Sequence, residues 1–140
     1  MKLDWDIVRD VMTEIEDMTA TERNAAQFRA RFDDDGADAT RARHVLLLRD
    51  AGLVSGVPYQ DFENAGLMNP ELTWEGHQLL ATIRSKDVWE RVKSIAKTKG
   101  LALSFDLVKI GGKLALEHVL KGITGDDAGN QQSRNQAMAG

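Results

Sequence analysis

The stretch RHVLLLRDAGLVSG, residues 43–56, constrains the fold of this chain more than any other segment. Its first half has the apolar content of a helix, and Gly52 is the residue type that ends a helix in the left-handed conformation. Residues 53–59 follow at once with the β-branched composition of a strand. We therefore predict a helix over 38–51 that runs directly into a strand over 53–59.

Further segments carry apolar residues at helical spacing and begin with residues that cap helices. We expect helices over 4–18, 74–85, 88–99 and 105–121, with N-caps at Asp4, Thr73, Asp87 and Ser104. Asp38 or Thr40 is expected to cap the helix over 38–51.

Several apolar residues and glycines indicate how these helices pack. Leu46 and Leu47 widen the apolar face of the helix over 38–51, which predicts burial on more than one side. Gly76 allows the helix over 74–85 to pack closely, and Gly100 ends the helix over 88–99. The pair Gly111-Gly112 predicts a kink or a close contact inside the last helix.

The strand over 53–59 is expected to stop near Pro58, which lacks a backbone donor. Residues 60–70 contain the turn signals Asn-Ala-Gly and Asn-Pro, so we expect a loop there and a short returning strand over 71–73. For residues 19–37 the sequence allows two alternatives, a short helix or a strand over 28–32. The sequence DDDG at 33–36 predicts a solvated turn, because the alternating ligands and distal Glu of a calcium loop are missing.

The composition excludes several classes of function. The 140 residues contain no cysteine, which excludes disulfides, zinc–thiolate sites and thiol catalysis. The N-terminus lacks the features of a signal peptide, and no segment has the roughly 20 apolar residues that span a bilayer, so we expect a cytoplasmic protein away from the membrane. His44, His77 and His118 lie on three different predicted helices, and no nucleophile–base spacing is visible. We expect no metal, no cofactor and no enzymatic activity.

Charge is distributed unevenly along the chain. Residues 1–38 hold 11 acidic and 5 basic side chains, whereas residues 39–99 hold 7 acidic and 9 basic side chains. Affinity for nucleic acid comes from cations, so the acidic N-terminal region argues against DNA and the region after it argues for DNA.

Two segments in this order resemble bacterial winged-helix regulators. HVLLLRDAGLV is similar to their recognition helix and first wing strand, and LTWEGHQLL is similar to their second wing strand and the helix after it. The resemblance implies a mainly α fold with a small β-hairpin wing, of the α+β class. It implies a winged-helix-like domain over 1–86, which a helical extension over 87–122 follows. Residues 123–140 have almost nothing to bury, so we predict a disordered tail there.

A closer resemblance covers residues 1–121. MKLDWDIVRDVMTEIE, HVLLLRDAGLV and LTWEGHQLLATIRSKDVWERVK are together similar to an uncharacterised family of bacterial and prophage proteins, domain of unknown function 2513. This resemblance implies a small winged-helix-like protein of mobile-element origin, with no activity to transfer. The acidic segment RFDDDGADATRAR departs from the compact link that such proteins have before the HVLLL helix.

In a winged-helix protein the recognition helix enters the major groove by its N-terminal half. The exposed residues there are expected to be Thr40, Arg41, Arg43 and His44. Tyr59, Gln60 and Asn64 of the wing loop are expected to contact the DNA backbone or minor groove, although Asp61 and Glu63 in the same loop repel phosphate. A second basic face is predicted at Arg84, Lys86, Arg91, Lys93 and Lys97.

Two functions remain open. The first is a non-enzymatic regulator or accessory protein, of phage or mobile-element origin, that binds double-stranded DNA. The second is a protein that uses the same scaffold to bind and inhibit a host protein, such as one of a defence system, without DNA. The acidic N-terminal region favours this second function. In either case the wide apolar stripe of the last helix predicts a homodimer through the C-terminal helices.

Overall fold

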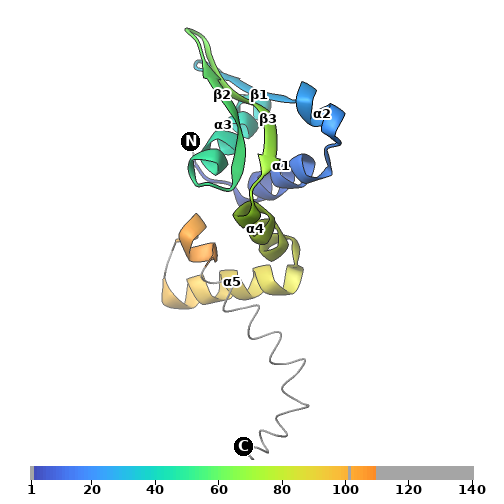
Figure 1. Ribbon diagram of the computed structural model, residues 1–140. Helices are drawn as coiled ribbons and strands as arrows, with labels where there is room; N and C mark the ends of the chain where they lie inside the picture. Colours follow the sequence, from blue (N-terminus) through green and yellow to red (C-terminus); the bar gives the residue numbers. More distant parts are fainter. Residues whose placement is uncertain (1, 101, 110–140) are drawn as a thin grey trace, which may run out of the picture. The chain divides into compact units, whose positions relative to one another are not determined.

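The computed structural model describes residues 2–100 and 102–109. It divides into two compact units, Met1–Ala81 and a second that begins at Thr82. The elements follow in the order α1 (Trp5–Asp17), α2 (Ala20–Ala25), β1 (Gln27–Arg31), α3 (Ala37–Asp50), β2 (Val54–Gln60), β3 (Asn64–Leu72), α4 (Trp74–Arg84) and α5 (Lys86–Lys99), as Figure 1 shows. The predicted α+β class, mainly helical with a small antiparallel sheet, is confirmed.

The helix α1 forms as its sequence predicts. The Asp4 carboxylate accepts hydrogen bonds from the backbone N–H groups of Asp6 and Ile7, a cap that contributes about 1 kcal/mol. Its buried residues recur on one stripe: Val8, Val11, Met12 and Ile15. The next segment holds both structures left open by the sequence. A capping box between Thr19 and Glu22 starts α2, and β1 follows it.

Two expectations for α3 are wrong. The helix begins at Ala37 with Gly36 as its N-cap, not Asp38 or Thr40. The reason is that the Asp34 carboxylate accepts the Gly36 N–H, and the Thr40 hydroxyl donates to the Gly36 carbonyl oxygen instead of capping. Leu47 is 37% exposed, so the helix is not buried on more than one side. Its buried apolar stripe consists of Ala39, Ala42, Val45 and Leu48.

The junction after α3 confirms the roles predicted for Gly52, Thr73 and Gly76. Gly52 has a φ of 79°, and the Leu53 N–H then donates to the Leu48 carbonyl. The Thr73 hydroxyl donates to the Gly52 carbonyl at 2.7 Å and accepts the Gly76 N–H at 3.0 Å, so it caps α4. A Cβ at Gly76 would lie 2.0 Å from the Leu53 carbonyl oxygen. The first turn of α4 therefore packs directly on the start of β2.

The strands form one antiparallel sheet in the order β1-β3-β2. The hairpin is longer than predicted, because β2 continues through Pro58 to Gln60 and β3 already begins at Asn64. Pro58 is tolerated because β2 is an edge strand. The predicted loop over 60–70 is therefore wrong, and only residues 61–63 connect the strands. Of the two turn signals, Asn-Pro lies at an irregularity, where the register opposite Ser55 and Val57 shifts and Asn69 has a positive φ of 54°. Asn-Ala-Gly, over residues 64–66, pairs regularly with β1.

The second unit includes α5. Its N-cap is Ser85, whose hydroxyl accepts the Val88 N–H, and not Asp87 as predicted. Gly100 ends α5 with a φ of 67°, as predicted. Residues 105–109 are helical, and the Ser104 hydroxyl accepts the Leu107 N–H as the predicted cap. The rest of that helix, the Gly111-Gly112 pair and the tail over 123–140 lie outside the described residues. Within the described part of the chain, no helix has the length and apolar character that crossing a membrane requires.

Replacing Gly76 with alanine should disrupt the junction. The added methyl group meets backbone atoms, which move less readily than a side chain, so we expect a loss of about 3 kcal/mol in the free energy of unfolding. Gly100→Ala is the control, because nothing lies within 4 Å of its Cβ position and only its left-handed backbone opposes the change. Urea denaturation of both variants measures the difference. Equal losses would contradict the role assigned to Gly76.

Candidate functional site

The N-terminal half of α3 is the predicted contact surface, and Arg41 lies in it. The Arg41 guanidinium forms ion pairs with the carboxylates of Asp10 and Glu14 on α1. Its side chain is only 25% exposed. The cation expected to grip a base or a phosphate is thus neutralised within the fold, where it ties α3 to α1.

Arg43 is also held by neighbouring groups. It donates a hydrogen bond to the Arg31 carbonyl oxygen at 2.8 Å and lies 3.6 Å from the Asp35 carboxylate. Arg31 in turn pairs with Asp33 at 3.2 Å and Glu63 at 3.0 Å. The hydrogen bond and charge of Arg31 lower the pKa of the Asp33 carboxyl. Arginines of α3 and β1 therefore tie the acidic turn and the hairpin tip together.

The prediction that His44 is exposed is wrong, since its side chain is fully buried. Its Nε2 accepts the backbone N–H of Asp4 at 3.0 Å, so the proton lies on Nδ1, which is 2.8 Å from the Thr40 carbonyl oxygen. His44 thus anchors the segment before α1 on α3. The half-buried Thr40 uses its hydroxyl within the helix, as described above.

Beside Arg41, an open groove of about 540 Å³ lies among α1, β1 and α3. Its lining residues are Glu14, Gln27, Phe28, Arg29, Asp38 and Arg41. Charges of both signs line this groove, and the first turn of α3 contributes a carboxylate to it.

The predicted wing-loop residues belong to strands. Tyr59 and Gln60 end β2, and Asn64 begins β3. The Tyr59 hydroxyl accepts a hydrogen bond from the Gln27 amide at 2.6 Å. The ring of Tyr59 covers Gly66, where a Cβ would lie 2.6 Å from the phenol oxygen. Tyr59 is thereby fixed on the sheet.

Two features of the hairpin tip were missed by the sequence analysis. The Asp61 carboxylate accepts the N–H groups of Glu63 and Asn64, and these bonds lower the pKa of its carboxyl. Phe62 is displayed at this turn with its side chain fully exposed, and Phe32 is 54% exposed. The backbone of Phe32 donates to the Glu63 carbonyl. The sequence left a strand over 28–32 open, and no pattern in it placed that strand beside the tip.

The predicted second basic face lies mainly on α5. Lys86, Arg91 and Lys97 are exposed, and Arg84 is exposed at the end of α4. Lys93 is half-buried, 3.0 Å from Glu90 and 5.7 Å from the centre of the Trp89 ring. Trp89 itself is buried and forms part of a core.

His77 belongs to no metal-binding cluster in the part of the chain that the structure describes. His77 lies 3.5 Å from Glu16, and His118 is outside the described residues. Over residues 2–100 and 102–109, no group of three or more His, Asp or Glu side chains is placed to hold a metal ion.

The two units differ in the balance of acidic and basic side chains. Residues 1–81 carry 16 acidic and 8 basic side chains, whereas residues 82–109 carry 3 acidic and 7 basic ones. The first unit is therefore strongly anionic, and its predicted DNA-contacting arginines are already paired with carboxylates or held by carbonyl groups.

Replacing His44 with alanine should destabilise the first unit. The change leaves the Asp4 N–H and the Thr40 carbonyl without this partner and opens a cavity, so we expect a loss of about 3 kcal/mol. His77→Ala is the control, because its partly exposed contact with Glu16 should contribute less than about 1 kcal/mol. Thermal and urea unfolding measure both variants. A His44 variant as stable as the wild type would contradict the buried hydrogen bonds.

Comparison with known proteins places this sequence among its relatives. It is 34% identical over 110 residues to an uncharacterised protein of Haemophilus influenzae (strain ATCC 51907 / DSM 11121 / KW20 / Rd), which covers 78% of this chain and 90% of that protein. No solved structure matches. The family model described as "Hypothetical protein (DUF2513)" matches residues 2–102. The chain therefore belongs to the DUF2513 family.

Proposed function

We propose that this protein is a non-enzymatic binding protein whose acidic first unit recognises a basic surface on a protein partner. The observation that carries the proposal is the pairing of Arg41 with Asp10 and Glu14. It removes the main cation from the end of α3 that a DNA-binding helix presents to the major groove.

The surroundings of that end of α3 support the same proposal. Asp33, Asp34 and Asp35 precede the helix and are exposed, and Asp38 lies in its first turn. Carboxylates at a helix N-terminus are stabilised by the helix dipole but repel phosphate. A protein surface rich in Lys or Arg complements this region and is drawn to it by long-range attraction.

DNA binding by a winged-helix-like scaffold is the second candidate. The hairpin β2–β3 and the pairing of β1 with β3 suit such a scaffold, and the basic side chains of α5 supply cations. In this case the residues that contact phosphate are Lys86, Arg91 and Lys97 rather than Arg41.

The proposal is tested first by carbodiimide cross-linking of the full chain in extract of its source cell. The reagent joins carboxylates to amines directly, so cross-links from α1 and residues 33–38 to lysines of one protein are expected. Binding of that purified protein should weaken at least about tenfold in an Asp17→Asn, Asp38→Asn double variant and should weaken with salt. Asp50→Asn, at the opposite end of α3, is the control and should bind normally.

Duplex DNA from the neighbourhood of the gene is tested in parallel by fluorescence anisotropy with a salt titration. Micromolar or tighter binding that falls steeply with salt would contradict the proposal. Loss of that binding in an Arg41→Ala, Arg43→Ala variant would place DNA on α3, and loss in a Lys86→Ala, Arg91→Ala, Lys97→Ala variant would place it on α5.

A further inference from the structure

The sheet β1-β3-β2 has one face turned to the core and one face turned to solvent. Residues paired directly across strands place their side chains on the same face. Phe28 pairs with Leu67 and both are buried, which defines the core side. The adjacent pairs therefore face outward, and we call the following set the outer face: Gln27, Arg29, Arg31, Val57, Tyr59 and Met68.

The centre of the outer face is apolar. Val57 and Met68 lie directly opposite each other and are 52% and 39% exposed. Tyr59 is the next outward residue of β2, and its ring extends this patch over Gly66. An apolar sheet face is stable when it is buried against another element, and a second sheet can pack on it about 10 Å away. Within the first unit no second sheet is present among the described residues.

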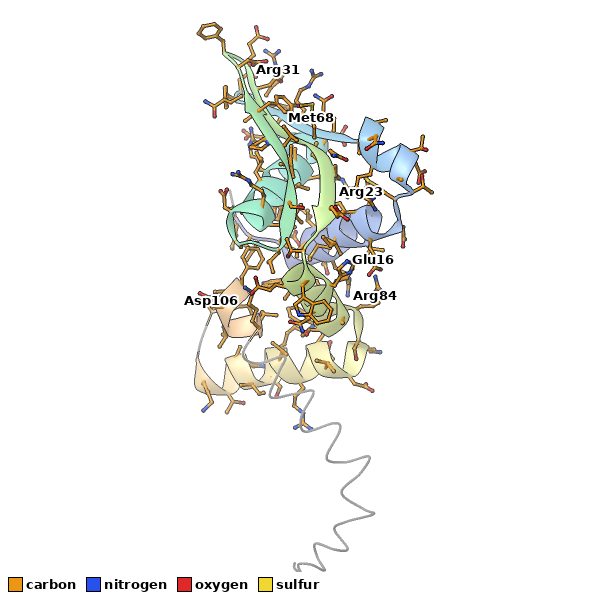
Figure 2. The ribbon with its side chains drawn as sticks, in the orientation of Figure 1. Glu16, Arg23, Arg31, Met68, Arg84 and Asp106 are labelled. Atoms are coloured by element: carbon orange, nitrogen blue, oxygen red, sulfur yellow. The ribbon has the colours of Figure 1, made fainter. Side chains whose placement is uncertain are left out.

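The charges around this centre have both signs. Arg29 and Arg31 lie on the outer face, and Asp61 and Glu63 lie at the adjoining tip, where Glu63 is 3.0 Å from Arg31. Figure 2 shows Met68 on the sheet and Arg31 nearer the tip. A nucleic acid or an anionic lipid surface would be repelled by the carboxylates. A second copy of the same face can place Arg29 near the carboxylates at the tip and apolar side chains against apolar side chains.

We propose that two copies of this chain form a homodimer by packing the outer faces of their sheets against each other. Because β3 is the central strand, Met68 of each copy then lies close to the two-fold axis. The proposal does not depend on the proposed function, since the acidic region around α3 is a different surface. In this homodimer Tyr59 and Val57 lie in the interface between the two copies.

The test is sedimentation velocity of the full chain over a range of concentrations, with two variants of one residue. Met68→Glu and Met68→Lys should each raise the dimer dissociation constant at least about 100-fold, because each places two like charges in an apolar contact. An equimolar mixture of the two variants should dimerise again, because opposite charges then meet. Leu47→Glu is the matched control, since Leu47 is 37% exposed on α3 and should leave the dimer intact.

Tyr59 is the only tyrosine of the chain, so 3-fluorotyrosine labels this face alone. Its ¹⁹F resonance should shift with protein concentration in the wild type and not in Met68→Lys, while circular dichroism confirms that the variants are folded. A protein that stays monomeric at millimolar concentration would overturn the proposal. So would a mixture of variants that fails to dimerise, or a dimer that leaves the ¹⁹F resonance unmoved, which would locate the contact elsewhere, for example in the C-terminal helices.

Discussion

The contact of Gly76 with the Leu53 carbonyl oxygen is the constraint on which the first unit depends. Three elements meet there, because Thr73 bonds to Gly52 at the end of α3, to Leu53 before β2 and to Gly76 in α4. Any side chain at position 76 would separate α4 from the strand and stretch all three bonds. These contacts hold the two ends of the β2–β3 hairpin together, between the end of α3 and the start of α4.

Local signals predicted the elements well because their causes are local. The Asp4 and Thr73 caps and the glycines at 52 and 100 act within a few residues of the chain, and all four have the predicted roles. The length of β3 was underestimated for the opposite reason. Its turn-like residues are held extended by partners on β1 and β2, far away in the sequence, and cross-strand pairing outweighs local preference.

The candidate site was harder to predict because side-chain pairing is a long-range property. His44 is buried by a bond to the backbone of Asp4, 40 residues earlier, and no local pattern marks that contact. Arg41 is separated by 31 and 27 residues from the carboxylates that bind it. The sequence shows how many arginines a helix carries. Affinity for phosphate depends on how many of these arginines remain unpaired in the folded protein. The excess of acidic residues in the N-terminal region did indicate this pairing, since many carboxylates leave few arginines unpaired.

The turn at the tip of the hairpin has a consequence for any partner that meets it. Asp61 bonds to two successive N–H groups of the turn, Arg31 binds Glu63, and the Asp61 N–H donates to the Asn64 carbonyl. Phe62 is therefore held out on a backbone that is already ordered. A partner with a cavity for this ring would bury the apolar surface of Phe62 without the entropic cost of ordering a loop. The Phe62 side chain alone can therefore anchor such a partner.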